Sequence, residues 1–335
     1  MTESLSKRDR LVRVVRGQPV DRLPLSLWRH FYVEETAAEP LAAALCRWHR
    51  RFDFDFCKIN VRAQYHTEGW GCKYAYSGQE HVKPQTVDLA VTEPGDYAGL
   101  EPLDPWSWPF GEMLDLVGLL REELGPDEVL LMTVFNPMSV ALDLAGGPEP
   151  LAAAVRSNSA AVHRGLRAIT DTFRDFARLC LDQGADGLYF ATTYAATADH
   201  FTVEQYEEFG RPYDLEILEE VEGAFLNMLH VCKSASYVRE LADYPVQVIN
   251  WDTNDASNPT LAQMRFACDE RALAGGLSRQ LFDQPEAGER LVEELRQARA
   301  MMGELPFIVG STCTIPTETR EENIDVVVRA VRSAT

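Results

Sequence analysis

One histidine and two cysteines stand where they could bind a metal ion together. His230 and Cys232 are two residues apart in the stretch Leu226–Cys232, and Cys313 follows the apolar run Phe307–Gly310. Two thiolates and one imidazole suit zinc better than magnesium or calcium. Three protein ligands would leave a fourth position for water or substrate, as in catalytic zinc sites. The alternative interpretation is a buried histidine beside two cysteines that only fill the core.

The chemistry of such a site would be thiol activation. A thiol bound at the open position would lose its proton and become a nucleophile at neutral pH, where a free thiol with a pKa of ~8.5 is mostly protonated. The chain has seven cysteines and no secretory leader is apparent at its start. An odd number of cysteines without a leader argues against a disulfide framework.

Short apolar, β-rich runs alternate with helical stretches along the 335 residues. This alternation predicts one α/β domain over residues 1–335, a single (β/α)8 barrel with an N-terminal extension. An open doubly wound sheet is the second choice, but the chain has no glycine-rich phosphate loop of either common type. The strands are expected at Leu23–Leu27, Phe54–Asn60, Val129–Phe135, Gly187–Thr192, Ala224–His230, Val246–Trp251, Leu273–Gly276 and Phe307–Gly310.

A barrel would bring the three ligands to one place. His230 and Cys232 follow the fifth expected strand and Cys313 follows the eighth. The carboxyl ends of barrel strands open onto one mouth, where the active sites of this fold lie. The segment His66–Gly111, rich in Gly, Pro, Trp and Tyr, is expected to form a long excursion over this mouth rather than a second domain.

Helices are expected between the strands. Thr202 and Gln205 are typical of a helix start, and Gly184 is typical of a helix end. The longest expected helical regions are residues 148–183, 286–302 and 321–331.

Other polar side chains follow the predicted strands and are candidates for the site. Asp252 is the expected hydrogen-bond partner of His230, because a metal-binding imidazole usually donates its other N–H to a carboxylate or carbonyl. For His66 and Glu68, a tight turn closing the excursion is an equal alternative. Asn60, like Asp252, is a candidate for a catalytic role or for supporting a ligand. The candidates for lining a substrate pocket are Arg29, Lys58, His66, Glu68, Asn136 and Tyr194.

The sequence resembles the uroporphyrinogen decarboxylase superfamily. The resemblance implies a single (β/α)8 barrel and one of two activities. One branch decarboxylates tetrapyrrole acetate groups without a metal, and the other uses zinc to move a methyl group between a corrinoid protein and a thiol. The resemblance is carried by Gly184–Gly187, Phe201–Pro212, Leu229–Cys232, Gly275–Gly276, Gly310–Pro316 and Glu322–Asn323, with weaker similarity from Asp21 onward.

The resemblance favours the methyltransferase branch, whose ligand pattern matches His230, Cys232 and Cys313 position by position. The decarboxylase branch grips carboxylates with an arginine-rich N-terminal stretch, but here Arg29 is the only arginine in it. Asn60 stands where the decarboxylase has its essential aspartate. The resemblance therefore implies a zinc methyltransferase, with a tetrapyrrole decarboxylase and a non-catalytic metal- or tetrapyrrole-binding protein as alternatives.

The motifs, the charge and the hydropathy of the chain also predict its partners and its location. The chain has no D-x-H-x-x-G corrinoid-binding stretch, so a methylcorrinoid would be carried by a separate protein. The substrate would be a small molecule, and a homodimer is a family-level expectation. A net charge of −20 argues against nucleic acid. The apolar runs are too short for a membrane span and the N-terminus lacks a signal-peptide pattern, so we expect a cytoplasmic protein.

Overall fold

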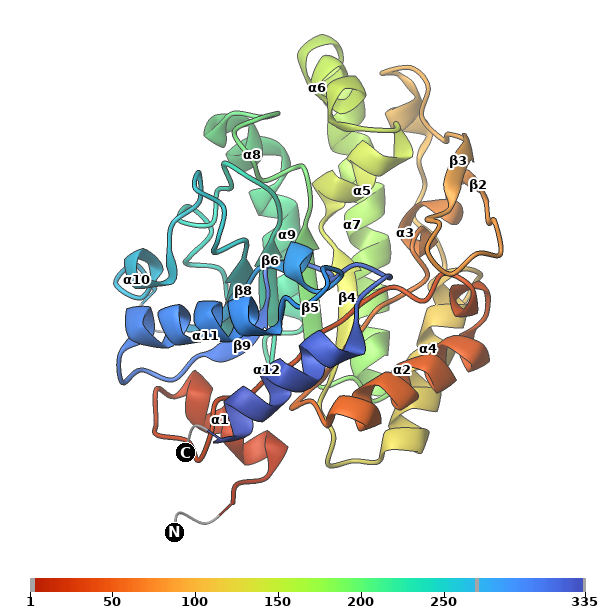
Figure 1. The fold of residues 1–335 in the computed structure, drawn as a ribbon. Helices are drawn as coiled ribbons and strands as arrows, with labels where there is room; N and C mark the ends of the chain where they lie inside the picture. Colours follow the sequence, from red (N-terminus) through yellow and green to blue (C-terminus); the bar gives the residue numbers. More distant parts are fainter. Residues whose placement is uncertain (1–3, 269–270, 334–335) are drawn as a thin grey trace.

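The computed structural model describes residues 4–268 and 271–333. Its centre is a parallel sheet that curls round on itself in the order β1-β4-β5-β6-β7-β8-β9 (Figure 1). The strands are β1 (Cys57–Ile59), β4 (Leu130–Phe135), β5 (Gly187–Thr192), β6 (Met228–Val231), β7 (Val248–Trp251), β8 (Ala272–Leu277) and β9 (Ile308–Ser311). All of them are buried along their whole length except Phe135, which explains why they read as continuous apolar runs.

The expected first strand, Leu23–Leu27, is reduced to a single β-bridge. Leu25 pairs in parallel with Val309 of β9, and the backbone N–H of Asp55, just before β1, donates to the carbonyl of Leu25 at 2.9 Å. The segment therefore joins β9 to β1 and closes the sheet, which confirms the predicted (β/α)8 barrel. Pro24 has no N–H group to extend the ladder, and this keeps the pairing short.

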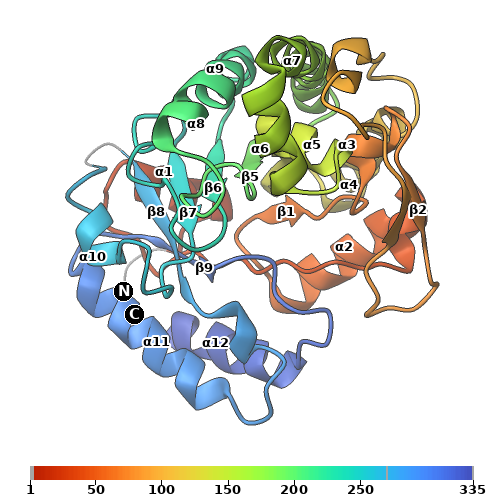
Figure 2. The same ribbon diagram turned by 90° about the horizontal axis from the view of Figure 1, so that it is seen from above.

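Helices surround the ring of strands in the view from above (Figure 2), except the first, which lies beneath the strands at the bottom of Figure 1. They are α1 (Lys7–Val15), α2 (Ala38–Phe52), α3 (Tyr65–Glu68), α4 (Phe110–Leu124), α5 (Pro137–Leu144), α6 (Pro148–Ser157), α7 (Ser159–Asp182), α8 (Val203–Phe209), α9 (Arg211–Glu220), α10 (Leu261–Met264), α11 (Gly288–Met302) and α12 (Glu321–Ser333). Within residues 4–268 and 271–333, no helix is both long and apolar enough to cross a membrane.

Local signals placed several helix ends correctly. Thr202 and Gln205 form the reciprocal capping pair at the start of α8, and Gly184 has a φ of 109° just beyond α7. The region predicted as one long helix over 148–183 is divided into α6 and α7. Asn158 makes the break, because its side chain accepts a hydrogen bond from the N–H of Ala161 and starts a new helix.

Two further predicted segments differ from the structure. The strand expected at Ala224–His230 is shorter at its start, because Ala224 closes a turn onto the carbonyl of Val221 at 3.0 Å. The excursion over His66–Gly111 contains an antiparallel pair that the prediction missed, β2 (Lys73–Ala75) and β3 (Gln85–Asp88). This pair lies at the side of the barrel beside α3, at the right-hand edge in Figure 1.

An apolar core fills the barrel interior beneath the strand ends. It combines Phe56, Tyr189, Met228 and other inward side chains from successive strands with residues of α1. Trp28 packs edge-on against Tyr189 with ring centroids 5.3 Å apart. A larger apolar layer lies between the sheet and the outer helices. The strand ends above this packed interior are therefore held by rigid elements on both sides.

Candidate metal centre

The three predicted metal ligands come together at the mouth of the barrel. The candidate ligand atoms of His230, Cys232 and Cys313 all lie within 4.8 Å of one another. The two sulfurs are 3.7 Å apart. Two sulfurs bound tetrahedrally to one zinc ion at ~2.3 Å would be separated by ~3.8 Å. The sulfur spacing therefore fits a shared zinc ion.

The orientation of the His230 ring is controlled by Asn250. These residues are paired neighbours on β6 and β7, so their side chains point to the same side of the sheet. The Nδ1 of His230 lies 2.6 Å from the Oδ1 of Asn250. The buried Nε2 of His230 has no hydrogen-bond partner among the described residues. An imidazole held through Nδ1 with an unpartnered Nε2 fits the donor set of a metal site.

Asp252 is not the partner of His230, so that expectation is corrected. Its carboxylate instead accepts a hydrogen bond from the N–H of Asn254 at 3.2 Å. Burial raises the pKa of Asp252. Side chains alternate along a strand, but β7 ends at Trp251, so Asp252 lies in the loop and does not continue the inward face that Asn250 occupies. This alternation, together with the pairing to His230, is the signal that would have found Asn250.

The two neighbouring cysteine thiols differ in the direction of their pKa shifts. The hydrogen bond from Cys232 lowers the pKa of Cys313 well below its usual value, and His230 adds to this effect. The same hydrogen bond, with burial, raises the pKa of Cys232 well above its usual value. Cys313 is therefore the thiol that ionises first.

A cavity of about 270 Å³ opens beside these residues. Three lysines line it, although the chain as a whole carries a net charge of −20. The polar lining residues besides the metal ligands are His30, Lys58, Gln64, His66, Lys83, Thr133, Asp143, Tyr189, Thr193, Tyr194, Lys233 and Thr314. The cavity therefore has more basic than acidic side chains in its lining, although the protein as a whole is acidic.

Lys58 lies at the floor of the cavity. Its Nζ donates to the Oδ1 of Asn60 at 2.6 Å and lies 4.8 Å from the ring centroid of Tyr189. Burial lowers the pKa of Lys58 to about 7. Tyr189 in turn stacks on the His230 ring at 5.2 Å. Asn60 does not line the cavity itself, and Tyr189 is a site residue that the sequence did not single out.

His66 and Glu68 were both predicted to line the substrate pocket, but only His66 does so. His66 lines the cavity, and its Nε2 lies 2.8 Å from the carboxylate of Asp143 on α5. Glu68 is absent from the lining and forms an ion pair with Arg62 at 2.6 Å. The short helix α3 turns the two side chains in different directions, because neighbouring helical positions do not share a face.

Two further candidates lie outside the cavity. Asn136 caps α5 through its Oδ1 and donates its Nδ2 to the carboxylate of Asp214 at 3.0 Å. Arg29 bonds the carbonyl of Thr317 and pairs with Glu80, both at 2.5 Å. Both side chains are therefore occupied by contacts that hold the fold. Tyr194, by contrast, lines the cavity and is 39% exposed.

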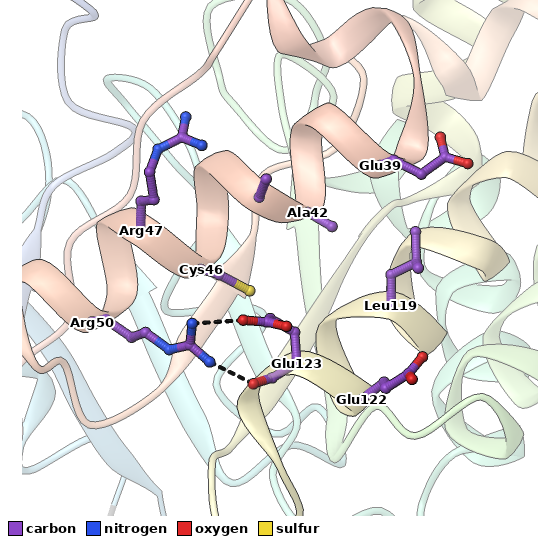
Figure 3. Close-up of a pocket in the computed structure, with 9 residues that line it drawn as sticks. Glu39, Ala42, Cys46, Arg47, Arg50, Leu119, Glu122 and Glu123 are labelled. Atoms are coloured by element: carbon purple, nitrogen blue, oxygen red, sulfur yellow. Dashed lines mark hydrogen bonds and ion pairs between the residues drawn. The ribbon is translucent and has the colours of Figure 1, made fainter.

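A second, larger hollow of about 740 Å³ lies on the outside between α2 and α4. Its one cysteine, Cys46, has its pKa raised to about 11 by burial, so it is not a reactive thiol. Arg50 and Glu123, which line it, are bonded to each other (Figure 3). The side chains that could bind a metal ion or activate a thiol therefore lie at the barrel mouth and not in this hollow.

Comparisons with known proteins agree with this fold. The model of the uroporphyrinogen decarboxylase family matches residues 6–334. The methylcobamide:CoM methyltransferase MtbA of Methanosarcina acetivorans is 23% identical over 250 residues, covering 69% of this chain and 71% of the relative. Its counterpart from Methanosarcina mazei is 24% identical over the same shares.

Solved structures are similar over almost the whole chain. A methyltransferase from Methanosarcina mazei has a TM-score of 0.82 at 18% identity, covering 98% of this chain and 99% of that one. A B12-independent methionine synthase from Shewanella sp. W3-18-1 has a TM-score of 0.60 at 12% identity, covering 93% and 98%. At these identities the structural similarity shows the fold alone.

Proposed function

The chain belongs to the uroporphyrinogen decarboxylase family, and from that premise we propose that it is a zinc-dependent methyltransferase. It would move a methyl group between a corrinoid protein and a thiol-like acceptor. The observation that carries the proposal is the 3.7 Å spacing of the Cys232 and Cys313 sulfurs beside the unpartnered Nε2 of His230. The methylcobamide:CoM methyltransferases among the relatives support the same reaction class.

Each residue of the site would have a separate role in such a reaction. His230, Cys232 and Cys313 would hold the zinc ion, and Asn250 would keep the His230 ring in position. When bound, zinc would supply the Lewis acidity that lets a thiol lose its proton near neutral pH. The packed floor of Tyr189 and Lys58 excludes water from below the ligands.

The cavity indicates what the acceptor is like. At about 270 Å³ it lies just below the range of roughly 300–1,000 Å³ that is typical of small-molecule pockets. Lys83 and Lys233, together with Lys58 when it is protonated, favour an acceptor with a negative charge. A corrinoid ring is much larger than the cavity, so it would be presented at the mouth by its own carrier protein.

Tetrapyrrole decarboxylation has less support. No arginine is found among the described residues that line the cavity. Arg29 is the arginine in the stretch that corresponds to the carboxylate-binding stretch of the decarboxylase branch. Its side chain is already hydrogen-bonded to the carbonyl of Thr317 and paired with Glu80. The cavity is also small for a tetrapyrrole.

The proposal is tested with zinc-loaded protein, free methylcobalamin and a panel of small thiols, by following the loss of the methyl–cobalt absorbance. We expect slow methyl transfer to at least one thiol, and none by zinc-free protein. A parallel anaerobic incubation with uroporphyrinogen should give no four-carboxylate product. Efficient formation of that product would favour the decarboxylase. A bound ligand without turnover of any kind would favour a non-catalytic binding protein.

A further inference from the structure

The residue after the metal ligand Cys232 has an unusual backbone conformation. Lys233 has a φ of 80°, in the left-handed region that residues with a side chain rarely adopt. Ala235, two residues later, has a φ of 46°. Such conformations persist only where the surrounding structure imposes them, and they cluster at functional sites.

The surrounding structure does impose this turn. The buried side chain of Asn258 donates to the carbonyl of Lys233 at 2.9 Å and accepts from the N–H of Ser236, also at 2.9 Å. On the opposite side, the hydroxyl of Thr197 donates to the carbonyl of Ser234 at 2.7 Å. The turn is thus clamped by the loops that follow β5 and β7.

The strained turn points a cation into the cavity. The Lys233 side chain lines the cavity, with its Nζ 4.2 Å from the ring centroid of Tyr194. No carboxylate of residues 4–268 or 271–333 forms an ion pair with it. The other two cavity lysines differ. Lys58 is buried at the floor and bonded to Asn60, and Lys83 stands on the exposed turn between β2 and β3.

We propose that Lys233 is the residue that selects the acceptor by its charge, by binding an anionic group at the end of the molecule opposite to the thiol. This inference rests on the proposed function. The anionic thiol itself belongs to the proposed function, and the new element is the residue that binds its charged group. Because Lys233 adjoins Cys232 in the chain, the clamped turn fixes the backbone from which the Lys233 side chain enters the cavity beside the candidate ligands.

The test compares 3-mercaptopropionate with 3-mercapto-1-propanol, which have the same length and differ in charge. Binding to zinc-loaded protein is measured by calorimetry, and KM and kcat are measured with methylcobalamin. The wild type should prefer the acid. Lys233→Met should weaken binding of the acid about tenfold, the cost of losing one charged hydrogen bond, with the alcohol little affected. The effect should appear in KM and not in kcat. Lys233→Arg should keep most of the preference.

The matched control is Lys73→Met, which should behave as the wild type. Lys73 is an exposed lysine of β2 that pairs with Asp88. Equal binding of the two thiols by the wild type, or no binding of either, would overturn the inference. So would an equal loss for both thiols in Lys233→Met, since that would indicate a structural role. If no thiol is methylated but the calorimetric preference depends on Lys233, the proposed function fails while the role of Lys233 stands.

Discussion

The Oδ1 of Asn250 and the Nδ1 of His230 are 2.6 Å apart across two adjacent barrel strands. The Nδ2 of Asn250 donates to the carbonyl of Ala274 at 3.0 Å, so its Oδ1 faces the imidazole as an acceptor. The proton of a neutral His230 ring is therefore on Nδ1, which leaves the lone pair of Nε2 toward the cysteines. A neutral amide therefore accepts the Nδ1–H hydrogen bond and orients the ring, whereas a carboxylate or a backbone carbonyl is the more usual partner of a metal-binding histidine.

Removing this partner should weaken metal binding without removing a ligand. We expect Asn250→Ala to lower the zinc affinity by about 10–100-fold, as is usual when a group that orients a ligand is lost. Competition with a chromophoric chelator measures the affinity. Asn254→Ala, an exposed residue of the loop after β7, is the control and should bind zinc as the wild type does. Equal affinities in all three proteins would contradict the assigned role.

The cysteines themselves should be essential for the metal. The wild type, purified without chelator, should contain about one zinc per chain, since three ligands and an open position make one catalytic-type site. The Cys232→Ser, Cys313→Ser double variant should lose it, because the hydroxyl group of serine is a poor ligand for zinc. Elemental analysis decides the matter, with Cys46→Ala as a cysteine variant outside the site. Zinc retained at the wild-type level by the double variant would rule out this centre.

The strain at Lys233 should be measurable as stability. Lys233→Gly should raise the free energy of unfolding by about 1 kcal/mol, because glycine adopts a positive φ without steric cost. Lys233→Met keeps a side chain at the same φ and should not be stabilised. Urea unfolding of the zinc-free proteins gives the comparison. If the glycine variant were no more stable than the methionine variant, the backbone at this position would not be strained.

The buried Asp214 should make stability depend on pH. Burial raises its pKa from 3.8 to about 7, although Tyr206, Tyr244 and Asn136 all donate to its carboxylate. Between these two pH values the folded chain holds a proton that the unfolded chain has lost. The contribution of Asp214 is therefore fully present below pH 3.8 and is lost as the pH rises through about 7, by at most about 1.4 kcal/mol per pH unit.

The Asp214→Asn variant cannot titrate at this position, so it isolates the effect. The stability of the wild type relative to this variant should fall between pH 4 and pH 7 and then level off, as measured by urea unfolding at each pH. Asp175→Asn, on the exposed surface of α7, controls for the loss of one acidic group. A relative stability that stays constant over this interval would show that Asp214 is ionised in the folded protein throughout.

The sequence by itself determined the type of fold and pointed to the candidate metal ligands. Buried parallel strands must be apolar along their length, and this local requirement makes strands such as β4 and β5 visible as runs of residues. The ligand types at His230 and Cys232 can also be read locally, because both lie where one strand passes into its loop. The exception is Leu23–Leu27, which was predicted as a full strand but forms only a single bridge at Leu25, because the pairing depends on partners far away in the chain.

Only the tertiary structure decided which side chains meet. Cys232 and Cys313 are 81 positions apart, and their contact exists because the closed sheet brings the ends of β6 and β9 to one mouth. Strand register placed Asn250 rather than Asp252 beside His230, and burial turned Asn136 toward Asp214 rather than toward the cavity. The left-handed backbone of Lys233 could not be foreseen from its residue type, because the hydrogen bonds that hold it come from Asn258 and Thr197 on other loops. Side-chain direction is set by the pairing of distant segments, and that information is not present in any one of them.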